Sequence, residues 1–252
     1  MNLKEAQLDY ILRMGDNALI LGQRLGEWCG HGPVLEQDIA ITNIALDLMG
    51  QARSLMQYAA EFEAKGRDED QVAFLRDVRE YRNVLLVEQP NEDWAYTIVR
   101  QFFFDVFNFY FHQEMTKSKD AHLAAIAEKS LKEITYHLRY SSEWMIRLGD
   151  GTEVSHEKMQ VAVDELWMYT GELTEMDQVD EIMVAEGIGV DLNKIKPLYD
   201  QKVNEILAEA TLQKPENDWM QSGGKIGRHT EHLGFILADM QFMQRAYPDM
   251  KW

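Results

Sequence analysis

The chain has 252 residues, and few of them break helices or cross-link chains. It contains one cysteine, Cys29, so it can form neither an internal disulfide nor a thiolate metal cluster of its own. Its five prolines lie at positions that suit the ends of helices, and long proline-free intervals separate them. The alternation of apolar and polar residues that is typical of half-buried strands is absent. These features predict a fold of long helices without strands.

Long apolar runs and an excess of positive charge are lacking as well. The most hydrophobic segment, residues 98–111, is too short to cross a bilayer and contains Arg100 and Asp105. The amino-terminal residues lack the apolar run of a signal peptide. A formal net charge of -18 at pH 7 repels nucleic acid and anionic lipid headgroups. We therefore expect a cytoplasmic protein that binds neither nucleic acid nor membranes.

Apolar residues at helical spacing are abundant. They predict four long helices, at about residues 4–28, 35–65, 93–117 and 121–148, and a shorter helix at about 69–83. Four long helices of similar length favour a four-helix bundle. Further helices are expected at about 155–173, 178–186, 192–210 and 225–247. The prediction is a single all-α domain over residues 1–252, with a bundle core at about 4–148 and a packed helical extension at about 155–247.

Each of the four long helices carries a narrow polar stripe. The stripes consist of Arg13, Asp16 and Asn17; of Asn43, Asp47, Gly50 and Ser54; of Gln101, Asp105, Asn108 and His112; and of Ser130, Glu133, His137 and Tyr140. Buried carboxylates are costly unless they are paired, hydrogen-bonded or bound to a metal. The alternative is a solvated face, which suits the third stripe least because that helix is covered with aromatic rings.

Inward-facing carboxylates and histidines are also how helical bundles hold two metal ions. Such a site takes a Glu from each of two helices and a Glu-x-x-His pair from each of the other two. The second helix offers Asp47 but has Gly50 at the His position, and the fourth offers His137 but has Ile134 at the Glu position. Glu133 points about 100° away around the helix. We therefore predict no metal cofactor in this chain.

Four of the polar residues on these helices are expected to interact with one another without a metal ion. We expect Asp47, Asp105, Glu133 and His137 to form a metal-free, buried network of hydrogen bonds and ion pairs.

A glycine-rich segment, residues 223–234, is the other candidate site. It carries Lys225, Arg228, His229 and His232. The two histidines could be a weak metal pair, and the glycines with the two cations could bind a phosphate at a helix start. The third interpretation is a junction that packs on the bundle or on a partner. We favour the third, because short motifs often match by chance.

Five stretches together resemble one family. They are residues 25–31 (LGEWCGH), 43–53 (NIALDLMGQAR), 85–91 (LLVEQPN), 136–139 (YHLR) and 223–234 (GGKIGRHTEHLG). They are similar to the PaaC family of ferritin-like subunits of bacterial ring 1,2-phenylacetyl-CoA epoxidase, also called phenylacetate-CoA oxygenase. The resemblance runs nearly from end to end and keeps the order of the motifs.

The resemblance implies a ferritin-like fold and a role in aerobic phenylacetate degradation. The complex inserts one oxygen atom of O2 into the ring of phenylacetyl-CoA. A homologous catalytic subunit, PaaA, holds the di-iron centre, PaaB aids assembly, and a reductase brings electrons from NADPH. The Glu-x-x-His motifs of PaaA correspond to Asp47–Gly50 and Ile134–His137 here. The chain would then be a structural subunit without metal, in homo- and hetero-oligomers.

Two other functions stay open beside a subunit that lacks catalytic activity itself. An independent ferritin-like metal oxidase would use Asp47, Asp105 and His137, and would bind metal stoichiometrically. A module that binds CoA esters would act through Lys225, Arg228 and His229, and would bind phenylacetyl-CoA by itself.

Overall fold

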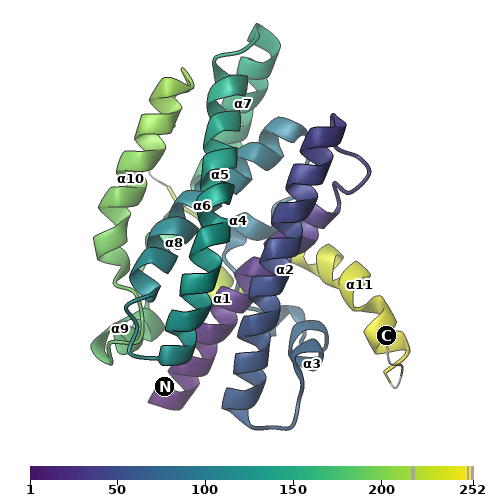
Figure 1. The fold of residues 1–252 in the computed structure, drawn as a ribbon, viewed down its shortest axis with the longest axis vertical. Helices are drawn as coiled ribbons and strands as arrows, with labels where there is room; N and C mark the ends of the chain where they lie inside the picture. The colour runs from purple at the N-terminus through teal and green to yellow at the C-terminus, as the bar shows by residue number, and fades with distance from the viewer. Residues whose placement is uncertain (217–218, 249, 251–252) are drawn as a thin grey trace. The chain divides into compact units, whose positions relative to one another are not determined.

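A computed structural model describes residues 1–216, 219–248 and 250. Every regular element in these ranges is a helix (Figure 1), which confirms the predicted all-α class and agrees with a ferritin-like helical bundle. The chain divides into two compact units. Unit 1 comprises Met1–Gln89 and Gly223–Trp252, and unit 2 comprises Pro90–Ser222. None of the described helices is long and apolar enough to span a membrane.

Unit 1 is built on two long helices that pack along each other, α1 (Leu3–Gly26) and α2 (Leu35–Glu63). The side chain of Asn2 accepts the N–H of Glu5 and so caps α1. Four short elements complete the unit: α3 (Glu69–Phe74), the 3-10 helix η1 (Val78–Glu80), α4 (Leu85–Glu88) and η3 (Gly224–Ile226). The last helix, α11 (Glu231–Ala246), contacts α1, α3 and α4.

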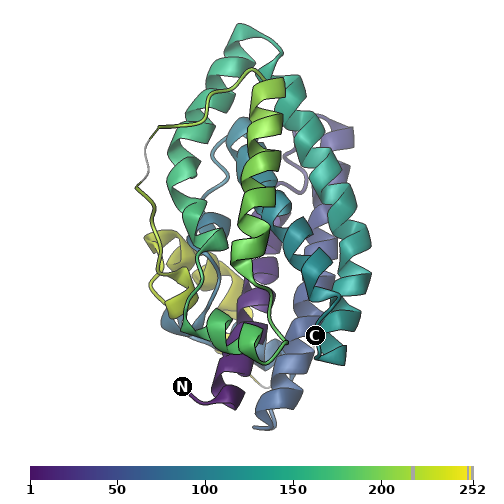
Figure 2. The ribbon, with the colours of Figure 1, turned by 90° about the vertical axis from the view of Figure 1, so that its left-hand side faces the viewer.

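Unit 2 is built on α5 (Trp94–Met115) and α6 (Ala121–Gly149). Around them lie α7 (Glu153–Leu166), η2 (Trp167–Tyr169), α8 (Gly171–Thr174), α9 (Gln178–Ala185) and α10 (Leu192–Glu209). Both α7 and α10 pack on α5, and α10 is the green helix facing the viewer in Figure 2. The aromatic run of α5 lies in the core, where Phe103 meets Trp167 edge to face at 5.7 Å between ring centroids.

The long helices begin and end close to their predicted positions, but the single helix predicted at 69–83 is wrong. In the structure α3 ends at Phe74, and residues 81–84 are extended. The Tyr81 side chain is fully buried there, and its hydroxyl donates to the Ala73 carbonyl. Burial of this ring in the unit therefore overrides the local preference for helix.

Three further boundaries differ from the sequence analysis. The helix expected from residue 155 begins at Glu153 instead, where the Thr152 side chain caps it. Pro197 lies inside α10 and not at a helix end. The last helix begins at Glu231, because residues 223–230 form a 3-10 turn and a loop. The single domain over 1–252 stays a prediction. The extension predicted at 155–247 contributes α7–α10 to unit 2 and α11 to unit 1.

Candidate functional site

Asp105 of α5 is the centre of a polar cluster inside unit 2. Its side chain is buried, with the residue only 1% exposed. Gln101, one turn earlier on α5, donates its Nε2–H to Oδ1 over 2.7 Å. Ser141 of α6 places its Oγ 2.8 Å from Oδ2. The cluster thus links the two long helices of unit 2 through neutral donors.

The surroundings of Asp105 favour its uncharged form. Burial raises its pKa to about 7, although a neighbouring His137 and the hydrogen bonds from Ser141 and Gln101 act in the opposite direction. The Ser141 Oγ also lies 3.0 Å from the carbonyl oxygen of His137. One hydroxyl hydrogen cannot serve both acceptors. The hydroxyl of Ser141 therefore donates either to the Asp105 carboxyl or to the His137 carbonyl at any one time.

The polar stripes differ in where the structure places them. All four residues of the α5 stripe are buried, and burial lowers the pKa of His112 to about 4 against the opposing effect of a hydrogen bond to the Asn108 carbonyl. The α6 stripe is buried except at the half-buried Glu133. On α2, Asn43 and Gly50 are exposed. This stripe therefore lies on a solvated face, which was the alternative to a buried stripe. The α1 residues Arg13, Asp16 and Asn17 are buried.

The residues predicted to form one network are therefore in different environments. Asp105 and His137 are buried in unit 2 and interact electrostatically, whereas Asp47 of unit 1 and Glu133 are half-buried. A network that joins all four stays a prediction. Nothing in the described ranges brings three or more His, Cys, Asp or Glu side chains into a group that could hold a metal ion.

Gly50 and Ile134 stand where the resemblance implies the His and Glu ligands of a di-iron subunit, and neither residue has a side chain that could bind a metal ion. Ile134 is fully buried and offers only hydrocarbon where a carboxylate is needed. Gly50 has no side chain, and a Cβ built on it would meet nothing within 4 Å.

Unit 1 also contains a polar cluster around an aspartate, Asp16 of α1, which is fully buried. Arg76 faces it with both terminal nitrogens: Nη1 lies 2.9 Å from Oδ2, and Nη2 donates to Oδ1. The backbone N–H of Arg82 donates to Oδ2 over 2.8 Å. Burial opposes the charge of Arg76, yet the attraction and hydrogen bond of Asp16 raise its pKa overall. Arg76 also lies over the Tyr81 ring, 4.3 Å from its centroid.

A third buried acid, Glu88 of α4, anchors the segment that precedes α11. His229 Nδ1 lies 2.9 Å from Oε2 of Glu88, and Thr230 donates its backbone N–H to Oε1 over 2.6 Å. The other ring nitrogen of His229 lies 3.1 Å from the Tyr81 carbonyl. Both ring nitrogens therefore face acceptors, which suits imidazolium. Burial opposes that charge, but the hydrogen bond and charge of Glu88 raise the pKa of His229 above its usual value.

Comparisons with known proteins identify the family of this chain. A model of the family described as "Phenylacetic acid catabolic protein" (PaaA_PaaC) matches residues 2–252. The chain belongs to this family. It is 50% identical over 243 residues to the 1,2-phenylacetyl-CoA epoxidase subunit that is designated C in Escherichia coli (strain K12), and the match covers 96% of this chain and 98% of that protein. The resemblance drawn from the five motifs is confirmed.

In this member of the phenylacetic acid catabolic protein family, the glycine-rich segment packs on its own unit. A Cβ on Gly224 would lie 2.2 Å from the Asn83 carbonyl oxygen, so the backbones approach too closely for a side chain. Lys225 and His232 are half-buried and Arg228 is exposed, while the His229 side chain is buried against Glu88. Contact of these residues with a partner or with CoA stays a prediction.

Sequence reasoning missed Arg76 and Glu88. Each lies far along the chain from the group it binds: 60 residues separate Arg76 from Asp16, and 141 separate Glu88 from His229. Helical spacing carries no information about such pairs. The only available signal was that Glu88 lies within one of the five motifs.

Proposed function

We propose that this chain is a structural, non-catalytic subunit of a cytoplasmic 1,2-phenylacetyl-CoA epoxidase that serves aerobic phenylacetate degradation. The observation that carries the proposal is the 50% identity to a subunit of the Escherichia coli epoxidase over almost the whole of both chains. Its partners would be a di-iron catalytic subunit of the PaaA type and, in the larger complex, a PaaB-type subunit and a reductase.

The chemistry of the ligand positions supports a role without metal. Gly50 and Ile134 supply no donor where a di-iron subunit needs His and Glu. The polar groups that remain in unit 2 are used to hold α5 against α6.

The work of such a subunit is to bind the native catalytic subunit. Binding to the folded partner stabilises it by mass action, at about 2.7 kcal/mol when the free subunit is 100 times above its dissociation constant. Networks that fix the helices of this chain would keep its docking surfaces in one conformation, which lowers the entropic cost of association.

The test is to produce the chain alone in iron-rich medium, and together with a PaaA-type catalytic subunit. We expect metal well below one ion per chain by mass spectrometry, no epoxide from the chain alone, and co-purification with the catalytic subunit. Epoxide should form only when the complex, the reductase, NADPH and O2 are present. Two iron or manganese ions per isolated chain, lost in Asp105→Asn and His137→Gln, would establish an independent metal oxidase instead. Tight binding of phenylacetyl-CoA by the chain alone would favour the CoA-ester module.

A further inference from the structure

The helix α11 is apolar on two sides. One side faces unit 1, with Leu233, Ile236 and Leu237 buried. The other side is exposed and carries Phe235, Phe242, Met243 and Tyr247, which are 67%, 63%, 40% and 49% exposed. Phe235 and Phe242 lie on one line of the helix, Met243 lies about 80° around from Phe235, and Tyr247 directly follows the helix end. The exposed acid Asp239 lies between Phe235 and Met243 around the helix. A helix that is apolar on both sides is normally covered on both.

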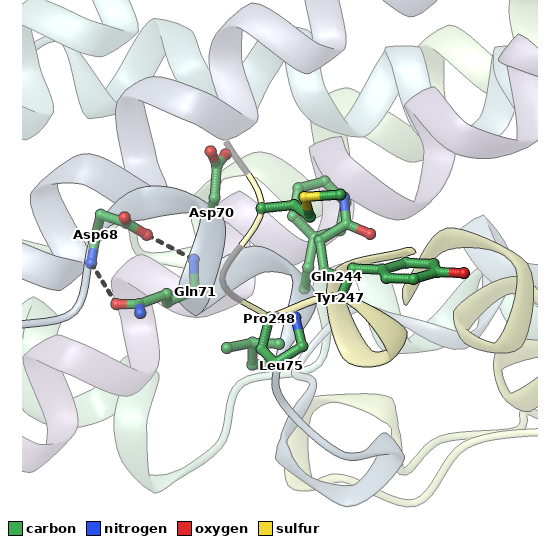
Figure 3. Close-up of a pocket in the computed structure, with 9 residues that line it drawn as sticks. Asp68, Asp70, Gln71, Leu75, Gln244, Tyr247 and Pro248 are labelled. Atoms are coloured by element: carbon green, nitrogen blue, oxygen red, sulfur yellow. Dashed lines mark hydrogen bonds between the residues drawn. The ribbon is translucent and has the colours of Figure 1, made fainter. Parts of the chain in front are cut away.

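A hollow of about 460 Å³ lies beside the end of α11 (Figure 3). Tyr247 belongs to both features, since its ring lies on the exposed side and lines the hollow. The opposite wall comes from α3 and the residues around it, among them Asp68, Asp70 and Leu75. All of these residues belong to unit 1. The exposed side of α11 and the hollow therefore form one continuous surface.

The hollow carries carboxylate acceptors, of which Asp68 already accepts the backbone N–H of Gln71. Among the described residues that line it, the charged ones are Asp68 and Asp70, which are both acids. Burial and the nearby carboxylates of Glu69 and Asp68 raise the pKa of Asp70, and Arg53 offsets this only in part. The Oε1 atom of Gln244 is buried and has no hydrogen-bond partner in the described part of the chain. A cation with several N–H donors complements these groups.

We propose that the exposed side of α11 and this hollow are a docking surface for an arginine-bearing, otherwise apolar segment of another epoxidase subunit. The guanidinium enters between Asp70 and Tyr247, and the neighbouring apolar side chains cover Phe235 and Phe242. An arginine suits the hollow better than a lysine, because its planar fork can reach two acceptors and lie on an aromatic ring. The inference rests on the proposed function, since it names a surface through which the complex assembles.

The size and charge of the surface identify this occupant. From Phe235 to Tyr247 the exposed side extends about 18 Å along the helix, at about 1.5 Å a residue, so a small cation in the hollow would leave most of it uncovered. The formal charge of -18 favours a basic partner over a second copy of this acidic chain.

Two single variants test the surface in the full-length chain. Phe242→Ser removes an exposed ring, and Asp70→Lys reverses an exposed charge, so neither empties the core. Matched controls on α7 are Val161→Ser, at a side chain 54% exposed, and Glu157→Lys. Each chain is titrated against the purified remaining epoxidase subunits at two salt concentrations. Amide hydrogen exchange is followed over residues 68–75 and 231–247.

The expected result is protection of both segments in the complex and affinity about tenfold weaker or more for each test variant, with little change in the controls. Binding of the wild type should weaken with salt, and binding of Asp70→Lys less so. Equal affinities and unchanged exchange in a complex that forms and is active would overturn the surface and leave the proposed function intact. If the wild-type chain binds no subunit and supports no epoxidation, both proposals fail.

Discussion

Unit 1 and unit 2 each bury an aspartate on a long helix, but different kinds of group face the two carboxyls. Asp16 on α1 faces the guanidinium of Arg76 and a backbone N–H. Asp105 on α5 faces an amide and a hydroxyl, and its pKa is raised to about 7. Both side chains are almost completely removed from solvent. Burial is common to the two acids, so the difference between them lies in the groups that face each carboxyl.

Because of this difference, we expect substitutions at the two sites to change the stability of the protein in different ways. An ion pair in a dry environment is sensitive to loss of one partner, because the remaining charge has no water to solvate it. A neutral cluster depends instead on the direction of each hydrogen bond. Four substitutions test this contrast, from the largest expected effect to the smallest.

Arg76→Met should be the most damaging, because it leaves the Asp16 carboxylate buried without its cation. We expect a loss of about 3–5 kcal/mol in the free energy of unfolding, measured by urea denaturation. Arg53→Met is the control, because Arg53 is 70% exposed and pairs with Glu69 at 3.3 Å, which is worth less than about 1 kcal/mol. Equal, small losses in both variants would show that the buried pair is not needed for stability.

Asp105→Asn should stabilise the protein at neutral and alkaline pH. Between about pH 4 and pH 7 the folded chain holds a proton that the unfolded chain has released, so the free energy of unfolding falls as the pH rises through this window. Asn keeps the neutral form and removes this slope. A gain of about 2 kcal/mol is expected at pH 8, within a limit of about 4 kcal/mol for three pKa units. Urea denaturation from pH 5 to pH 8 measures it.

The control for that change is Asp239→Asn on the exposed side of α11. It should leave the pH dependence as it is in the wild type. A variant Asp105→Asn that is less stable than the wild type at every pH would mean that the folded protein prefers the charged carboxylate.

His229→Gln should weaken the anchor of α11 in a pH-dependent way. The folded pKa of His229 is raised, so the pair with Glu88 contributes its full stability below about pH 6.5 and loses it as the pH rises through the folded pKa. We expect a loss of about 1.5 kcal/mol at pH 6 and a smaller loss at pH 9. Urea unfolding at the two pH values measures it, with the exposed His122→Gln as control. A loss that is the same at both values would argue against a charged pair.

Ser141→Ala should have the smallest effect, about 1 kcal/mol, because it removes one hydrogen bond. It also removes a group that lowers the pKa of Asp105, so that pKa should rise further. Carbon-13 NMR titration of the Asp105 carboxyl measures the shift. Ser142→Ala is a close control, since Ser142 is buried beside it and its hydroxyl has no partner within the described residues. Equal shifts in the two variants would place Asp105 outside the control of Ser141.

Much of the fold followed from local patterns, whereas the main miss has a tertiary cause. Helical spacing placed the four long helices well, because their apolar residues repeat over many turns. It failed at residues 69–83, where burial of Tyr81 bends the chain out of a helix. Burial of the α5 stripe could be anticipated from the surrounding rings, while the exposure of Gly50 on α2 could not.

The sequence by itself determined the helical class and the family, because both follow from the order and spacing of residues. The prediction that Gly50 and Ile134 replace metal ligands rests on the same order of residues. Only the tertiary structure decided which buried acid receives a cation. Arg76 reaches Asp16 and His229 reaches Glu88 across large distances along the chain, whereas Asp105 accepts hydrogen bonds from an amide and a hydroxyl and lies near His137. Electrostatic energy depends on separation in space and on solvent exposure, and neither is fixed until the helices pack.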